Sequence, residues 1–212
     1  MMPIKIDRRG LKGALILCSA ALLFLLILQN RTATYLFLLA ALLHLAFFRD
    51  PFRKIPPGNI AVSAADGLVV EIDSVNEARF LKEEAIKIGI FLSIFDPHLN
   101  RAPTAGEVKY LSYEPGKFLN VLNKESVKVN ESNWIGIEQD NIRVLVRQIA
   151  GAIARRIHCD VKMGEKVEKG QKMGIICYGS RTECYFPKRL FRSTIKVGQR
   201  VKAGETILGE WL

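Results

Sequence analysis

The residue pair with the most direct chemical potential is a serine that follows a glycine, Gly179-Ser180, near the end of the chain. A serine hydroxyl is a weak nucleophile unless a base lies within hydrogen-bond reach, and a carboxylate commonly orients that base. Glycine has no Cβ, so the carbonyl of Gly179 would be open to attack by the neighbouring hydroxyl. Most Gly-Ser steps are simple turns, so the surrounding segments must decide whether this one is reactive.

A metal site is not expected. His158, Cys159 and Asp160 have suitable side chains, but adjacent residues of a strand point to alternate faces and cannot converge on one ion. The 4 cysteines contain no C-x-x-C pair, which argues against a zinc ribbon and against a dense disulfide scaffold.

The Gly-Ser step lies between two copies of a ten-residue pattern. Residues 161–170 and 195–204 share the order apolar-Lys-apolar-Gly-x-basic-Val-x-x-Gly. Glycines at two turns around a short apolar strand suit a compact pseudo-symmetric barrel. The pattern resembles the half-motif of lipoyl and biotinyl domains and of membrane-fusion adaptor proteins. A carrier domain would have a lysine at the connecting hairpin, where this chain has Gly-Ser.

The part of the chain before the repeats is predicted to be β-structure. Five short segments are rich in β-branched residues: 67–72, 86–95, 107–113, 134–138 and 142–149. Gln139-Asp140-Asn141 is typical of a hairpin turn between the last two. Strands do not alternate with long helices, which disfavours a doubly wound sheet. We therefore expect a mainly β fold, an antiparallel barrel or sandwich with a lipoyl-like pseudo-repeat at its C-terminal end.

The first quarter of the chain predicts an apolar helical hairpin. Residues 13–28 and 32–48 carry no acidic or basic charge, and each run is near the minimum length of about 20 residues for a spanning helix. Basic residues lie before the first run and after the second, so the positive-inside rule keeps both flanks cytoplasmic. A second apolar run directly after the first disfavours a cleaved signal peptide. We expect residues 1–48 to anchor the protein in the cell membrane, as a spanning or re-entrant hairpin, and residues 49–212 to form a domain on the cytoplasmic side.

Five motifs in a fixed order then give a family resemblance. The sequence resembles the phosphatidylserine decarboxylase family, in particular its shorter archaeal-type branch, over residues 47–212. The motifs are Phe48-Arg49-Asp50-Pro51, Ala65-Asp66-Gly67, the run from Phe95 to Pro103 (FDPHLNRAP), Ile149-Ala150-Gly151 with Ala154-Arg155-Arg156-Ile157, and Tyr178-Gly179-Ser180-Arg181.

The resemblance implies an enzyme that converts phosphatidylserine, or its archaeal ether-lipid analogue, to phosphatidylethanolamine and CO2. Such enzymes bind the substrate amine as a Schiff base on a pyruvoyl group, without a metal or pyridoxal phosphate. They make this group from a serine by cutting their own chain. Here the cut would fall between Gly179 and Ser180 and leave chains 1–179 and 180–212 as a heterodimer, which could oligomerise.

The resemblance also assigns roles to individual residues. It places His98 and Asp66 as the base and the orienting carboxylate for Ser180. The larger branch of the family has a second histidine three residues after the first, and Arg101 stands there in this chain. A guanidinium stays protonated and cannot act as a base, so we expect Arg101 to pair with the substrate phosphate or carboxylate.

The charge balance fits a lipid partner. The chain has 31 Lys+Arg against 21 Asp+Glu, a net charge of +10, but the basic residues are scattered and form no nucleic-acid-reading module. An anionic bilayer surface and a lipid headgroup account for this charge. The alternative function is a membrane-anchored adaptor or carrier without catalysis. This alternative explains the hairpin and the repeats. However, such adaptors usually have long heptad helices between the half-motifs, which this sequence does not have, and the alternative leaves the His98 motif unexplained.

Overall fold

The structure is a computed structural model that describes residues 5–152, 156–177 and 180–212. The chain divides into two compact units, one ending at Phe52 and one running from Arg53 to Leu212. The predicted division, after residue 48, lies four residues earlier.

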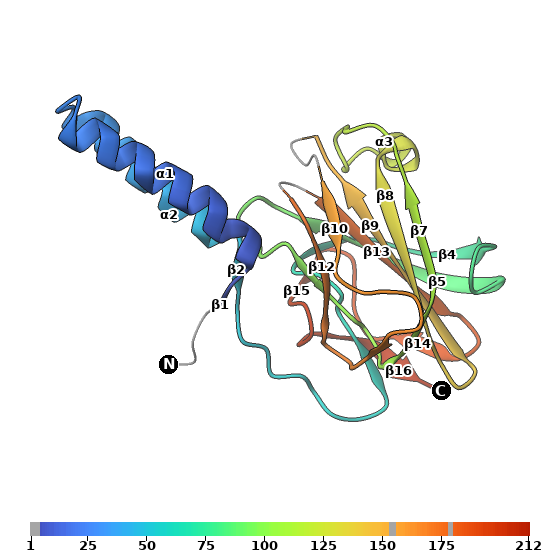
Figure 1. The fold of residues 1–212 in the computed structure, drawn as a ribbon. Helices are drawn as coiled ribbons and strands as arrows, with labels where there is room; N and C mark the ends of the chain where they lie inside the picture. Colours follow the sequence, from blue (N-terminus) through green and yellow to red (C-terminus); the bar gives the residue numbers. More distant parts are fainter. Residues whose placement is uncertain (1–4, 153–155, 178–179) are drawn as a thin grey trace. The chain divides into compact units, whose positions relative to one another are not determined.

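The first unit is the expected helical hairpin (Figure 1). Helix α1 (Arg8–Leu26) and helix α2 (Arg31–Phe47) are flanked by the short antiparallel strands β1 (Lys5–Ile6) and β2 (Arg49–Asp50). Each helix begins after a side chain that caps it, because Asp7 accepts from the amide of Arg9 and Asn30 from that of Ala33.

Small residues allow the two helices to approach closely. A Cβ added to Gly10 would lie 2.5 Å from the side chain of Phe48, and one added to Gly13 would lie 2.4 Å from the ring of His44. Nearer the tip of the hairpin, the rings of Phe24 and Phe37 stack with centroids 5.2 Å apart.

The outer surface of the hairpin is apolar. Most of its leucines are exposed, for example Leu15, Leu36 and Leu42, each more than half accessible. A helix of a soluble domain would instead bury its apolar residues on one face. Helix α1 is long and apolar enough to cross a membrane, whereas α2 is apolar but shorter. This unit is therefore compatible with membrane association.

The second unit is mainly β-structure, as predicted, and contains three antiparallel sheets (Figure 1). The eight-stranded sheet has the order β11-β7-β8-β9-β13-β5-β4-β15. Its strands are β4 (Gly67–Glu77), β5 (Glu83–Leu92), β7 (Gly106–Glu114), β8 (Ser132–Gln139), β9 (Ile142–Ala150), β11 (Lys166–Val167), β13 (Ser180–Pro187) and β15 (Arg200–Val201). The five predicted segments correspond to β4, β5, β7, β8 and β9.

The two smaller sheets have three strands each. One has the order β10-β12-β6, and the other β14-β16-β3. Their strands are β3 (Ile60–Val62), β6 (Leu99–Arg101), β10 (Ile157–Cys159), β12 (Lys172–Ile176), β14 (Phe191–Ser193) and β16 (Ile207–Trp211). One apolar core is shared by all three sheets, with Ile88 from the large sheet, Met173 from the first small sheet and Leu208 from the second fully buried in it. The short helix α3 (Lys124–Val129) lies in the connection between β7 and β8.

The pseudo-repeat occupies both edges of the eight-stranded sheet. Strand β11 of the first copy pairs with β7 at one edge, and strand β15 of the second copy pairs with β4 at the other. The contacts correspond: Gly164 donates to the carbonyl of Val108 and Gly198 to that of Val69, both at 2.8 Å. Both glycines have positive φ, so the turn requires glycine in each copy.

Strand β5 ends earlier than predicted. The predicted strand extends to Phe95, but β5 ends at Leu92. The carboxylate of Asp96 accepts from the amide of Ser93 at 2.9 Å and from its hydroxyl at 2.7 Å. These side-chain hydrogen bonds take the place of sheet pairing, and the chain turns before it reaches His98.

Candidate active site

Ser180 is the first residue of strand β13, in the middle of the large sheet. It pairs with Leu92 of β5 on one side and with Ala150 of β9 on the other. Ser180 is fully buried, and its hydroxyl has no hydrogen-bond partner among the described residues. A buried hydroxyl without a partner is costly, which marks this position as unusual. The other half of the predicted cleavage site, Gly179, lies outside the described residues.

His98 lies directly before strand β6 and is also fully buried. Its Nδ1 lies 2.7 Å from the backbone carbonyl oxygen of Asp96. Because a carbonyl only accepts, Nδ1 carries the proton of a neutral ring and Nε2 is left as the basic nitrogen. The carbonyl of His98 accepts from the amide of Ile176 at 3.2 Å, so the histidine lies beside the chain four residues before Ser180.

A buried chain of amide side chains connects the strand of His98 to that of Ser180. Asn100 donates to the hydroxyl oxygen of Thr182 at 3.0 Å and accepts from Gln148 at 2.8 Å. Gln148 in turn accepts from Asn133 at 2.8 Å. Asn100 is two residues after His98, and Thr182 is two residues after Ser180.

Residues two apart along a strand share a face, so Ser180 lies on the face of Thr182. The Asn100–Thr182 hydrogen bond therefore holds the segment that follows His98 against the serine-bearing face of strand β13. Asn100, Gln148 and Thr182 were not among the predicted site residues. Their signal in the sequence was a polar residue at a buried position of β6, β9 and β13.

Asp66 precedes Gly67 at the start of strand β4. The glycine is required, because φ is 151° and an added Cβ would lie 2.1 Å from the carbonyl oxygen of Phe91. The Asp66 carboxylate forms an ion pair with Arg53 at 2.6 Å, and both side chains are more than nine-tenths buried. Burial raises the pKa of Asp66 to about 6, although Arg53 and the amide of Ala203 lower it.

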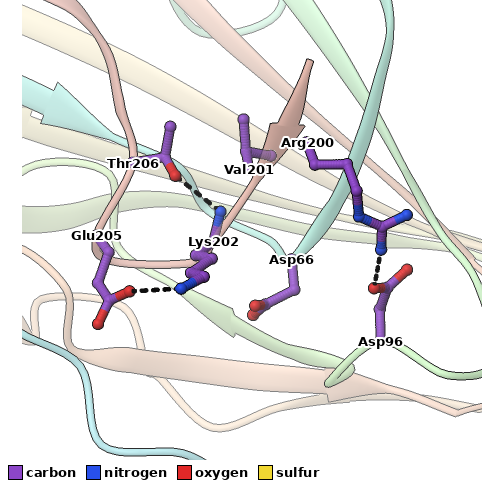
Figure 2. Close-up of a pocket in the computed structure, with 7 residues that line it drawn as sticks. All are labelled: Asp66, Asp96, Arg200, Val201, Lys202, Glu205 and Thr206. Carbon is purple, nitrogen blue, oxygen red and sulfur yellow. Dashed lines mark hydrogen bonds and ion pairs between the residues drawn. The ribbon is translucent and has the colours of Figure 1, made fainter. Parts of the chain in front are cut away.

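Asp66 and Asp96 line the same polar cleft, of about 540 Å³ (Figure 2). The Asp96 carboxylate accepts from Arg200 at 2.5 Å, and Lys202 lies 3.9 Å from Glu205 in the same cleft. The structure thus joins His98 to Asp96 by a hydrogen bond and joins Asp66 to Asp96 through a shared cleft. A direct Asp66–His98 contact stays a prediction.

Arg101 lies at the pseudo-repeat. Its guanidinium donates to the carbonyl of Gly170 at 2.9 Å, at the end of the first copy. A Cβ added to Gly204, at the end of the second copy, would lie 3.2 Å from the side chain of Arg101. Arg101 thus lies beside both equivalent turns, and its role in binding the substrate stays a prediction.

Comparison with known proteins places these residues in a family context. A family model described as phosphatidylserine decarboxylase matches residues 40–209. Three curated proteins named phosphatidylserine decarboxylase proenzyme are similar to the chain. The one from Carboxydothermus hydrogenoformans is 49% identical over 164 residues, which cover 77% of each chain. Those from Desulfotalea psychrophila and Solibacter usitatus are 40% and 39% identical and cover 84% and 99% of this chain, and 83% and 98% of their own.

Proposed function

The chain belongs to the phosphatidylserine decarboxylase family, and we propose that it converts phosphatidylserine to phosphatidylethanolamine and CO2 with a pyruvoyl group made from Ser180. The observation that carries the proposal is the position of Ser180 in a chain similar to proenzymes. Ser180 is buried at the start of a central strand, and within the described part of the chain its hydroxyl has no hydrogen-bond partner. The word proenzyme in the names of the relatives fits a protein that must first cut itself.

Self-cleavage would use the chain's own groups. The Oγ of Ser180 attacks the carbonyl carbon of Gly179, and the peptide nitrogen leaves as an amine, which converts the amide to an ester. His98 is the proposed base, because its Nδ1 bond to the Asp96 carbonyl leaves Nε2 free of the ring proton. Loss of the Cα proton of residue 180 then eliminates the Gly179 carboxylate. The remaining dehydroalanine takes up water and releases ammonia, which leaves a pyruvoyl group on chain 180–212.

The residues around position 180 fit this group. A pyruvoyl group supplies a ketone that binds the substrate amine and accepts the electrons released as CO2 leaves. Strand β13 is paired on both sides at residue 180, so the group would stay fixed after the chain is cut. In this proposal His98 holds and returns the proton during turnover, and Asp66 is the carboxylate that orients it.

Two cavities of different character support a lipid substrate. An apolar cavity of about 300 Å³ is lined by residues that include Leu92, the pairing partner of Ser180, and Phe95. The next residue, Asp96, lines the polar cleft that also contains Arg200 and Lys202. The apolar cavity suits acyl chains, and a cleft lined by both cations and carboxylates suits a headgroup that carries phosphate, carboxylate and ammonium groups. Arg101 remains a proposed further contact for the phosphate or carboxylate.

The helical hairpin supports a membrane-bound enzyme. We propose that residues 1–48 anchor the protein in the cell membrane and that the β-domain works on the cytoplasmic side. The basic residues on both flanks of the hairpin support this orientation. The two cleaved chains would remain together as one enzyme, since strand β13 of the small chain lies between β5 and β9 of the large one.

The direct test is release of labelled CO2 from phosphatidylserine labelled at the serine carboxyl, with purified protein in detergent micelles. The proposal predicts release that hydroxylamine abolishes, because hydroxylamine blocks the ketone, and no release by Ser180→Ala. A parallel assay with the archaeal ether-linked analogue decides between the two lipid classes. A cleaved protein that releases no CO2 from either lipid would contradict the proposed reaction.

A further inference from the structure

A second polar cavity, of about 160 Å³, lies against the opposite face of strand β13 from Ser180. Alternate residues of a strand point to opposite faces, so Cys184 and Phe186 enter the core while Arg181 and Glu183 line this cavity. Its lining contains four cations and two carboxylates: Lys87, Lys128, Arg147 and Arg181 with Glu71 and Glu183.

Both carboxylates of the cavity are already engaged. Glu71 accepts from Arg181 and forms an ion pair with Lys87 at 3.2 Å. Glu183 lies 2.8 Å from Arg181 and accepts from the Tyr185 hydroxyl at 2.7 Å. Burial and the neighbouring Glu183 raise the pKa of Tyr185 well above 10, so this hydroxyl is a neutral donor and adds no negative charge.

The guanidinium of Arg147 lies 3.6 Å from Glu183 and donates to the carbonyl of Val127, and that of Arg181 donates to Glu71, but each keeps one donor atom without an acceptor in the described part of the chain. The Nε atoms of Arg147 and Arg181 are buried and have no hydrogen-bond partner among the described residues. Both residues are more than nine-tenths buried. A buried donor without a partner costs about 1–3 kcal/mol, and more when it is charged.

The nearby acidic residues do not supply the missing acceptors. Asp73 is about half exposed and lies 4.0 Å from Lys87, and Glu114 is engaged by Arg79 and Trp134. Neither residue lines the cavity. The cavity therefore has an excess of positive charge and of N–H donors.

We propose that this cavity binds one small oxyanion of the phosphate class, either free or carried by a lipid headgroup. Its oxygens would accept from Arg147 and Arg181, and Lys128 at the rim would add a further positive charge. The volume is about five times the roughly 30 Å³ that a water molecule occupies in the liquid, which is room for a tetrahedral oxyanion. Because Arg181 follows Ser180 in the chain, a bound anion would order the start of β13 from the face opposite to the serine.

The test is binding of radiolabelled inorganic phosphate to the full-length protein in detergent, by equilibrium dialysis at constant ionic strength. One saturable site per chain is expected. Lys128→Gln should weaken binding about threefold to tenfold, because it removes one charge beside the anion in a partly screened site. Glu125→Gln should strengthen binding, because Glu125 holds Lys128 at 2.8 Å and competes for it. Both side chains are exposed, so neither change should affect folding.

A second exposed pair provides the matched control. Lys109 and Glu107 form a similar contact of 2.6 Å and do not line the cavity, so Lys109→Gln and Glu107→Gln should leave binding unchanged. If phosphatidylglycerol vesicles displace the bound phosphate, the site takes a phosphate carried by a lipid. If they do not, the site takes a free oxyanion. The proposal is overturned if phosphate shows no saturable binding, or if the variants of the two pairs change the affinity for phosphate equally. Neither outcome depends on whether the chain decarboxylates a lipid.

Discussion

The hydroxyl oxygen of Thr182 accepts a hydrogen bond of 3.0 Å from the side chain of Asn100. This contact joins strand β6, which follows His98, to strand β13, which begins at Ser180. Two short segments that are 82 residues apart in the sequence are thereby held in contact. The candidate site depends on this buried polar connection as much as on the reactive residues.

Replacement of Thr182 by valine tests that connection. Thr182→Val keeps the shape of the side chain but leaves the Asn100 amide without this acceptor inside the core. We expect the free energy of unfolding in urea to fall by about 1–3 kcal/mol and self-cleavage to slow. Thr194→Val, at an exposed threonine, is the control and should change neither. Equal stability of the two variants would show that the contact does not fix the strands.

His98→Asn should remove the base but keep a donor near the Asp96 carbonyl. The asparagine amide can replace Nδ1 but not Nε2, so we expect self-cleavage to slow by a factor of about 10²–10⁴. The measurement is the fraction of intact chain against time on denaturing gels. His158→Asn, in strand β10, should cleave at the normal rate. Normal cleavage of His98→Asn would assign the base to another group.

Asp66 should make the stability of the protein depend on pH. Its pKa is about 6 in the folded state against an ordinary 3.8, so the folded protein holds this proton more tightly. Stability from this group is therefore present below pH 4 and is lost as the pH rises to 6, by about 3 kcal/mol in total, with no further change above that. Unfolding measured from pH 4 to 7 should show this decline in the unmodified protein and not in Asp66→Asn.

Asp73→Asn, at an exposed carboxyl, is the control for that series and should keep the decline. Parallel pH profiles of the unmodified protein and Asp66→Asn would contradict the raised pKa.

Arg101→Ala separates two roles of the arginine. Loss of the hydrogen bond to the Gly170 carbonyl should lower the unfolding free energy by about 1.5–3 kcal/mol whatever the function. If Arg101 also pairs with the substrate, the affinity for phosphatidylserine vesicles should fall, and Arg101→Lys should retain part of it. Unchanged vesicle binding by Arg101→Ala with normal self-cleavage would remove Arg101 from the substrate site.

Much of the β-domain could be predicted from local sequence. The β8–β9 hairpin follows from the Gln139-Asp140-Asn141 turn, where Asp140 has a positive φ, as such a turn requires. The repeated glycines predicted two equivalent turns, and the structure has them at opposite edges of one sheet. These features depend on residues close together in the chain, so the sequence pattern is sufficient.

The environment of the site could not be predicted in the same way. The acceptor for His98 Nδ1 is the Asp96 carbonyl, whose position depends on a local turn in which the Asp96 carboxylate accepts from Ser93. The Asn100–Gln148 contact joins residues 48 positions apart, and no periodicity signals it. Strands β6 and β15, of three and two residues, are too short to show a pattern, and pairing with their neighbours defines them.

The most direct test of the central claim is the intact mass of the purified protein under denaturing conditions. The account predicts two chains, residues 1–179 and 180–212, the smaller carrying a carbonyl that reacts with hydroxylamine and no free amine. Ser180→Ala should give a single chain of 212 residues. A single intact chain from the unmodified protein, without a carbonyl that reacts with hydroxylamine, would contradict the account and favour the non-catalytic adaptor.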